Sequence, residues 1–362
     1  MSNSNSNKRL DYNDLAKSLG MLTIIWGHVR LGDWSNAFVY AWHIPLFFFL
    51  SGMVFNKERY VDFKSFFFKK VKSLLIPYAI FSVLTWIVWA AFSFITHAQV
   101  ESYWMPLVQT LIAQGSGGFL IHNVPLWFVS CLFVMEIMYY FIADLRKGWN
   151  ITITILLAAI SYCLINYWDG WDITLLPWSL EVACLGLPIY ALGHLIVQKW
   201  GHQNMQNWVG EHKMISLMLV MAFAGIVVVG SSWNGSISFG HSDLGRNVFV
   251  SYACAIMGTI MMIVTCMLIA ASSWNVKNTK LMQAIKWFGR NSFTAMVIHN
   301  PIKGIVCVII GMAFHCGSGA VSKNDYYSLI AFIITLVLTV FGIITTNWVK
   351  QLYQGMRNKT NV

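Results

Sequence analysis

Apolar runs long enough to cross a lipid bilayer recur along this chain and are joined by short polar segments. Of the 362 residues, 57% are hydrophobic and only 10% are charged. A membrane helix needs about 20 apolar residues, because the hydrocarbon core is about 30 Å thick. The runs therefore predict an all-α integral membrane protein, a polytopic bundle of about ten transmembrane helices. The expected helices cover residues 14-30, 36-55, 74-96, 124-143, 151-167, 173-198, 214-231, 247-271, 292-314 and 326-348.

The whole chain, residues 1-362, is expected to form one transmembrane domain with short tails at 1-12 and 349-362. Segment 100-120 contains Pro106 and a glycine-rich run, so we expect an external loop with an interfacial helix there. The first apolar run lacks a small-residue cleavage site, and we expect it to be retained rather than removed as a signal peptide.

Lys and Arg are distributed unevenly over the expected loops. With the N-terminus in the cytoplasm, all but four of the 24 fall on the cytoplasmic side, the exceptions being Arg30, Arg246, Lys303 and Lys323. Cytoplasmic loops of membrane proteins carry such an excess. Both termini are therefore expected to be cytoplasmic, in a multi-pass protein of the cell inner membrane. The same distribution explains the net charge of +10 without a nucleic-acid partner.

Lys17 and His28 place two ionisable groups inside the first apolar run. At about 100° per residue, an eleven-residue step brings them within about 20° of one helix face and about 16 Å apart along the axis. Ionisable side chains that persist inside a bilayer usually face a bundle interior or a water-filled cavity. We therefore expect a functional site on this helix, with Lys17 near its cytoplasmic end and His28 in its outer half.

Two more ionisable residues, His43 and Glu181, are expected at a depth similar to that of His28. Each follows the point at which its helix enters from the outer side. The remaining intramembrane candidates are Glu136, His194, His299 and Lys303. The seven cysteines show no CxxC pair and no zinc-ligand spacing, so they are expected to be core residues, and no metal is expected.

Five blocks of sequence carry a resemblance to a known family. They are Lys17 to His28; His43, Pro45, Phe47, Phe48, Ser51 and Gly52; Lys69, Lys70, Lys72, Leu74, Leu75, Pro77 and Tyr78; Leu126, Trp127 and Phe128; and, more weakly, Phe288, Gly289, Asn291 and Ser292 with His299 downstream. On these blocks the chain resembles the membrane-bound acyltransferase family 3, especially its fucose 4-O-acetylase-like branch. The resemblance covers nearly the whole chain.

The resemblance implies transfer of an acyl group, usually acetyl from acetyl-CoA, to a hydroxyl of a cell-surface carbohydrate or its lipid-linked precursor. The family's essential histidine maps to His28 and its basic partner to Lys17. Two positions depart from the family pattern. Members often have arginine in place of Lys17, and lysine lacks the bidentate fork of arginine. Many also have arginines where this chain has Lys69 to Lys72.

Each candidate has a functional and a structural interpretation. A hydroxyl needs a base to attack a thioester, and histidine has a suitable pKa, so His28 is expected to be the general base. The alternative is a histidine hydrogen-bonded at a helix end. Glu181 is the expected orienter of His28, or else an interfacial cap. Lys17 is expected to meet a phosphate or the pantetheine arm of CoA, or else to snorkel at the helix end.

The other candidates are assigned to the donor or the acceptor. Lys69, Lys70 and Lys72 are expected to hold the phosphates of CoA, although topology alone would also place lysines there. His299 is expected to line the donor channel. Contact with substrate is expected for three residues, His43, Trp127 and Asn291. The alternative for His43 is packing next to Pro45, and the alternative for Trp127 is a place in an interfacial aromatic belt.

Two other functions compete with acyl transfer from CoA to a carbohydrate. A transporter or flippase would also explain buried ionisable residues in a polytopic bundle. The spacing of His28 and Asp33 matches a short pattern of glycerophospholipid acyltransferases, but no later block of that family is evident. The expected partners are an acyl-CoA donor, a glycan or lipid-linked sugar acceptor and membrane lipid, and a homo-oligomer stays an open alternative.

Overall fold

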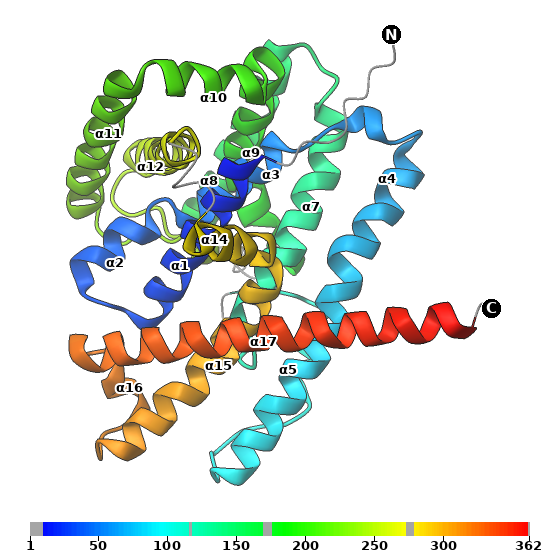
Figure 1. Cartoon of the computed structure of the whole chain (residues 1–362), viewed down its shortest axis with the longest axis vertical. Helices are drawn as coiled ribbons and strands as arrows, with labels where there is room; N and C mark the ends of the chain where they lie inside the picture. Colours follow the sequence, from blue (N-terminus) through cyan, green and yellow to red (C-terminus); the bar gives the residue numbers. More distant parts are fainter. Residues whose placement is uncertain (1–9, 116–117, 169–175, 273–278, 361–362) are drawn as a thin grey trace.

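The computed structural model describes residues 10-115, 118-168, 176-272 and 279-360, and most of these are helical (Figure 1). No strand occurs among them. Helices extend over α1 (Asp11–Val29), α2 (Asp33–Tyr40), α3 (His43–Met53), α4 (Phe63–Lys70), α5 (Ile76–Ile95), α6 (Met105–Gln109), α7 (Trp127–Ile142), α8 (Lys147–Tyr167), α9 (Leu180–Trp200), α10 (His202–Glu211), α11 (Lys213–Asn234), α12 (Val248–Ala270), α14 (Lys280–Arg290), α15 (Ser292–Ala313), α16 (Ser318–Val321) and α17 (Asp325–Thr360).

Eight helical stretches in the described residues are long and apolar enough to cross a membrane. The predicted all-α membrane bundle is therefore confirmed, whereas the count of about ten helices is not. The eight stretches are Phe63–Ile95, Val124–Ile142, Lys147–Tyr167, Pro177–Trp200, Lys213–Asn234, Val248–Ala270, Ser292–Ala313 and Asp325–Gln354. The first of them joins α4 to α5 through a π-helical turn, Val71–Leu75. The predicted start of the 173-198 helix falls partly outside the described residues.

The two predicted spans missing from this set lie at the N-terminal end. The helix expected at 14-30 is present as α1. Its polar residues make it less apolar than the eight stretches that are long and apolar enough to cross a membrane. The continuous helix expected at 36-55 is wrong, because the chain leaves helical geometry at Trp42, with φ −139°, and divides into α2 and α3. Pro45 favours the break. Proline lacks an N–H and clashes with the carbonyl four residues earlier, so it is accommodated best in the first turn of a helix, where Pro45 lies in α3.

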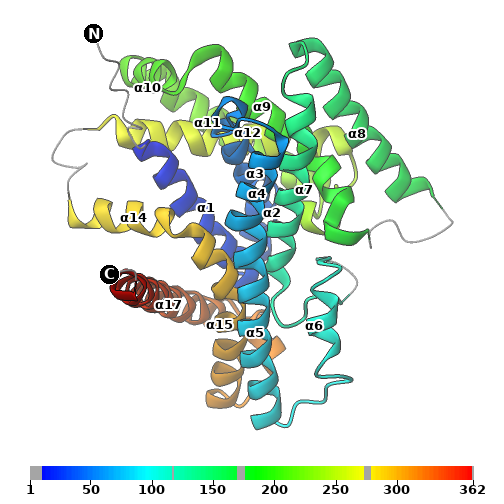
Figure 2. The same cartoon turned by 90° about the vertical axis from the view of Figure 1, so that its right-hand side faces the viewer.

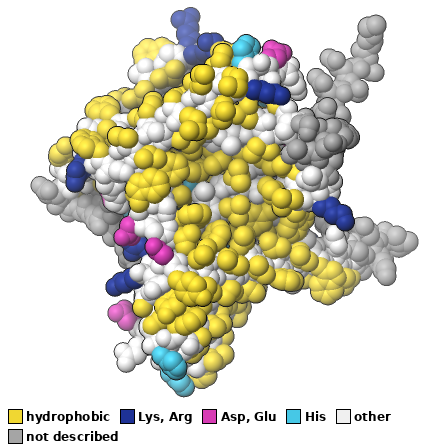
Figure 3. Space-filling model, turned by 60° about the vertical axis from the view of Figure 1, so that its left-hand side comes forward, with side chains coloured by type: hydrophobic (Ala, Val, Ile, Leu, Met, Phe, Trp, Pro, Cys, Tyr) yellow, Lys and Arg dark blue, Asp and Glu magenta, His cyan; other side chains and the backbone are white. Residues whose placement is uncertain are grey.

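Apolar side chains cover most of the face seen in Figure 3, and lysines and arginines lie toward its margins. Large exposed hydrophobic residues are concentrated on the spans, among them Ile80, Leu84 and Ile87 of α5 and Ile333, Val337 and Phe341 of α17. Such surfaces are stable in contact with lipid hydrocarbon, where no water is available to backbone or polar groups. The orientation of the bundle relative to the cytoplasm stays a prediction.

Close helix packing fixes the position of α3. A Cβ atom added to Gly52 would lie 2.0 Å from the carbonyl oxygen of Tyr190, and one added to Gly193 would lie 2.3 Å from that of Phe49. Small residues that let helix backbones touch are typical of membrane interfaces. The two glycines therefore clamp α3 against α9 and hold the residues of α3 that face the site.

Ion pairs and a close backbone contact hold α1 against α14. Asp11 Oδ2 lies 3.0 Å from Lys286 Nζ, and Asp14 Oδ2 lies 2.9 Å from Arg290 Nε. A Cβ atom on Gly289 would lie 1.8 Å from the carbonyl oxygen of Asp14. The helix that carries Lys17 and His28 is therefore held at its first turn. Figure 2 shows α1 descending from this end toward α15.

Candidate active site

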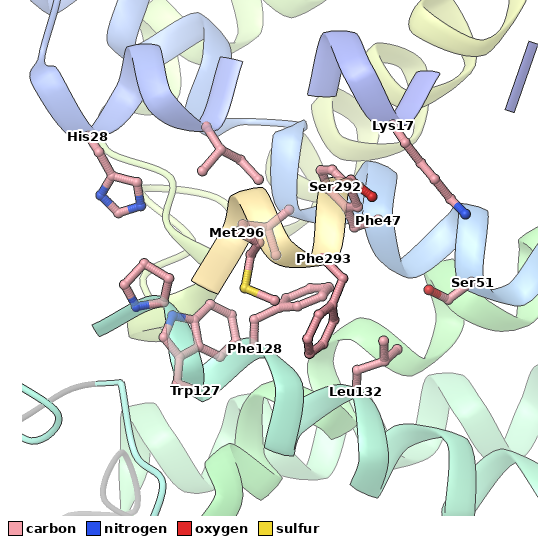
Figure 4. A pocket seen from close by; sticks show the side chains of 13 residues that line it. Lys17, His28, Phe47, Ser51, Trp127, Phe128, Leu132, Ser292, Phe293 and Met296 are labelled. Carbon is pink, nitrogen blue, oxygen red and sulfur yellow. The ribbon is translucent and has the colours of Figure 1, made fainter. Parts of the chain in front are cut away.

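A pocket connects the two residues singled out on α1. Lys17 and His28 lie at its opposite ends, and Phe128, Phe293 and Met296 lie between them (Figure 4). We call it the Lys17 pocket; its volume is about 160 Å³. Most of its wall is apolar, with hydroxyl groups from Ser51 and Ser292. As the eleven-residue spacing predicts, the two ionisable side chains share one face of the helix.

A second pocket, of about 490 Å³, lies beyond His28. We call it the Arg30 pocket. Its wall comes from the end of α1, from α2 and from the segment 236-241, and its polar residues are Arg30, Asp33, Asn36, Tyr40, Ser236, Ser238 and His241. The side-chain oxygen of Asn36 is buried without a hydrogen-bond partner among the described residues. His28 lines both this pocket and the Lys17 pocket.

In the structure, the ring of His299 lies next to that of His28. Their ring centroids are 5.1 Å apart, with the planes inclined at 49°. His299 is fully buried, and its Nδ1–H donates to the carbonyl oxygen of Met296 at 2.8 Å. A carbonyl only accepts, so Nδ1 carries the proton and Nε2 presents a lone pair. Within the described residues, this Nε2 has no partner.

His43 also lies close enough to His28 to interact with it electrostatically. Its Nδ1–H donates to the carbonyl oxygen of Val39 at 2.8 Å. Its ring packs edge-on against that of Tyr40, with 4.8 Å between the ring centroids. Tyr40 lines the Arg30 pocket, whereas His43 is buried behind it. His43 therefore lies outside the lining of both pockets, and its predicted contact with substrate stays a prediction.

Glu181 is the residue expected to orient His28. It is buried at the start of α9, where its Oε1 accepts a hydrogen bond from Gln114 Nε2 at 3.0 Å. Glu181 lines neither of the two pockets at His28. Its role as the orienter of His28 therefore stays a prediction, because equal depth in the membrane does not by itself bring two side chains together.

The three lysines expected to hold CoA do not act as one group. Lys70 pairs with the buried Glu136 of α7, with 2.8 Å between Nζ and Oε1. Lys69 and Lys72 are exposed. None of the three lines the Lys17 pocket. Lys70 thus forms an ion pair within the bundle, and donor binding by the three lysines stays a prediction.

Trp127 and Asn291 have different surroundings. Trp127 lines the Lys17 pocket, and its indole lies between Gly115 and Gly240, where a Cβ atom on either glycine would come within 2.6 Å of it. Asn291 precedes α15 and bonds to the Trp287 carbonyl and to Asn347 of α17. Asn291 lies outside the lining of the Lys17 pocket and links three helices, whereas Trp127 forms part of the cavity wall.

No motif in the sequence indicates the Arg30 pocket, because its residues come from separate segments of the chain. No group of three or more His, Cys, Asp or Glu suited to a metal ion is found in the part of the chain that the structure describes. A histidine shared by an apolar pocket and a polar pocket is suited to a group transfer between two different ligands.

Comparison with known families identifies the chain. A family model described as an acyltransferase domain, that of acyltransferase family 3, matches residues 10–349. No curated protein and no solved structure matches the chain. The fold and the family together define a multi-pass membrane acyltransferase. This chain belongs to the acyltransferase family 3, as its motifs in the first 130 residues and around His299 had indicated.

Proposed function

We propose that the protein is an O-acyltransferase that moves an acyl group, in the first instance acetyl, from acyl-CoA to a hydroxyl of a cell-surface carbohydrate or its lipid-linked precursor. His28 acts as the general base. The observation that carries the proposal is that His28 lines two pockets of different chemistry. The family assignment favours this function over transport, the other candidate for a polytopic bundle with buried ionisable residues.

The Lys17 pocket is the proposed donor site. Its apolar wall suits the pantetheine arm and excludes water, which protects a thioester from hydrolysis. Lys17, about 16 Å from His28 along the helix, would meet a phosphate or the start of that arm. In the proposed orientation, in the inner membrane, cytosolic acetyl-CoA enters from the lysine-rich side.

The Arg30 pocket is the proposed acceptor site. Asp33, Asn36 and Arg30 offer hydrogen-bond acceptors and donors, and Tyr40 offers a ring face, the groups with which proteins commonly bind sugars. Its volume lies in the range of small-molecule sites, about 300 to 1,000 Å³. An unpartnered amide oxygen on Asn36 would accept a hydrogen bond from a sugar hydroxyl.

The proposed reaction begins with His28 taking the proton from the acceptor hydroxyl. The oxygen then attacks the thioester carbonyl carbon, a C–O bond forms and the C–S bond breaks. The proton held by His28 passes to the departing sulfur, so the products are an ester and free CoA thiol. Both substrates must reach one imidazole, a condition that the shared position of His28 meets.

Filling each pocket separately tests the assignment of the Lys17 pocket to the donor. Ser51→Leu adds bulk to the Lys17 pocket and is expected to weaken acetyl-CoA binding by about tenfold or more, the effect of about 1.4 kcal/mol. Ala37→Leu adds similar bulk to the Arg30 pocket and should leave acetyl-CoA binding unchanged. Calorimetric titration of the detergent-purified protein measures both. Equal weakening by the two variants would contradict the assignment.

His299 is the proposed positioning residue for His28. The ring centroids of His299 and His28 are 5.1 Å apart, and the Nε2 lone pair of His299 has no partner among the described residues. In the proposed reaction this lone pair accepts the N–H of one His28 nitrogen, which leaves the other nitrogen free to act as the base. His299→Phe keeps a ring but removes the acceptor, and His299→Gln restores an acceptor oxygen.

We expect His299→Phe to lower kcat about tenfold, the value of one hydrogen bond of about 1.4 kcal/mol, with the KM for acetyl-CoA unchanged. His299→Gln should recover most of the loss. Steady-state kinetics at varied acetyl-CoA separates the two parameters. A rise in KM in both variants, without a fall in kcat, would instead return His299 to the donor channel predicted from the sequence.

A further inference from the structure

A third pocket, of about 220 Å³, lies between α5 and α15 and shares no lining residue with the two pockets at His28. Trp89 and Phe92 line it from α5, Asn300 and Lys303 from α15, and His122 from the segment that precedes α7. We call it the His122 pocket. Figure 2 shows α5 and α15 side by side over this part of the bundle.

The polar groups of the His122 pocket are incompletely satisfied by the protein. His122 is 3% exposed, and neither ring nitrogen has a hydrogen-bond partner among the described residues. Leaving a buried polar group unpaired costs about 1–3 kcal/mol, so each such group calls for an explanation. No ion pair involves Lys303 in the part of the chain that the structure describes. The pocket therefore combines the cationic Lys303, which has no acidic partner, with the two ring nitrogen atoms of His122, which have no hydrogen-bond partner among the described residues.

Aromatic residues beside the pocket indicate its depth in the membrane. Trp86 Nε1–H donates to the carbonyl oxygen of Tyr103 at 2.6 Å, and the rings of Trp86 and Trp104 are 5.0 Å apart. Trp89 packs against Tyr103, with 6.0 Å between the ring centroids. Tryptophan and tyrosine collect at the level of the lipid headgroups.

The length of the helix agrees with this depth. Lys70 and Trp89 belong to one continuous helical stretch, Phe63–Ile95. At 1.5 Å per residue they lie about 28 Å apart, close to the thickness of the hydrocarbon core, about 30 Å. This spacing and the aromatic residues favour a position of the His122 pocket near the interface opposite the lysine-rich start of this stretch.

We propose that the His122 pocket binds the phosphate group of an anionic membrane lipid. Lys303 supplies the positive charge, His122 and Asn300 supply N–H donors to the phosphate oxygens, and Trp89 and Phe92 cover the adjoining apolar part of the lipid. Inorganic phosphate shares the anionic chemistry. The headgroup depth and the apolar wall favour the lipid. The proposal does not depend on the proposed acyl transfer.

Native mass spectrometry of the full-length protein, released from detergent after incubation with phosphatidylglycerol or phosphatidylcholine, tests the proposal. Wild-type protein is expected to retain phosphatidylglycerol in preference to phosphatidylcholine. Lys303→Met and His122→Phe should each lower that retention about tenfold, the effect of losing one charge-assisted hydrogen bond. The matched control, Lys323→Met, removes an exposed lysine next to α16 and should behave as wild type. Activity is not the readout, because Lys303 also interacts electrostatically with His28.

Equal retention of the two lipids, or undiminished retention of phosphatidylglycerol by Lys303→Met, would overturn the proposal. Displacement of bound lipid by millimolar inorganic phosphate would overturn the lipid assignment in favour of a free anion. Lys303 is only half-buried, so Lys303→Met keeps the test valid if the buried His122→Phe variant fails to fold. A thermal melt of each variant confirms folding before the lipid is added.

Discussion

Replacing His28 by alanine is expected to lower acyl transfer about 100-fold or more while acetyl-CoA still binds. The loss follows from removal of the base, which typically contributes a factor of 10² to 10⁴. Binding should persist because the apolar wall of the Lys17 pocket and Lys17 itself remain. Release of free CoA thiol by the purified protein, supplied with acetyl-CoA and a glycan extract from the source cells, measures the reaction. Calorimetric titration measures the binding.

The matched control for this prediction is His97→Asn. His97 is exposed and has a positive φ of 51°, which asparagine accepts more readily than most residues. It lies outside both pockets at His28 and should keep wild-type activity. Full activity of a folded His28→Ala protein would contradict the assignment of His28 as the general base. Loss of acetyl-CoA binding in that variant would place His28 in donor binding instead.

Replacing Lys70 by methionine is expected to destabilise the protein by about 3–5 kcal/mol, because the carboxylate of Glu136 is then buried without a counter-charge. Only 8% of the Glu136 side chain is exposed, and its Oε2 already lacks a partner among the described residues. The double variant Lys70→Met with Glu136→Leu removes both charges and should recover most of the stability. Denaturant or thermal unfolding in detergent of the wild type, Lys70→Met, Glu136→Leu and the double variant gives the four values of the double-mutant cycle.

The same variants distinguish the two interpretations of Lys70. If the lysine holds a phosphate of CoA, as the sequence predicted, Lys70→Met should weaken acetyl-CoA binding, and the double variant should not restore it. If the lysine neutralises Glu136, binding should follow stability and return in the double variant. Unchanged stability in Lys70→Met would contradict the ion pair.

Helix content and the shared face of Lys17 and His28 were predictable from the sequence, because apolar length and helical period are properties of a single segment. The broken second span was harder to predict. Residues 36-55 are apolar enough for a helix, and only the position of Pro45 hints that α3 must begin at His43. A proline near the start of an apolar run is equally compatible with a helix that begins there and with a kinked span.

The partners of His28 could not be predicted, because they depend on which helices are neighbours. The sequence predicts a similar depth for Glu181 and His28, but depth does not specify the angular position of a helix in a bundle. The structure brings His299 of α15 to His28 and leaves Glu181 with Gln114. The weak family block that ends at His299 was the one available signal, and it suggested the donor channel. The Arg30 pocket has no motif, because three separate segments build it.

Mass spectrometry of surface glycans from the source cells tests the central claim most directly. Cells that lack the protein should lose a defined O-acyl group from their glycans, and wild-type protein or His97→Asn should restore it. His28→Ala, present in the membrane at wild-type abundance, should fail to restore it. Restoration of the full O-acyl content by His28→Ala, or unchanged glycans in cells without the protein, would contradict the proposed function.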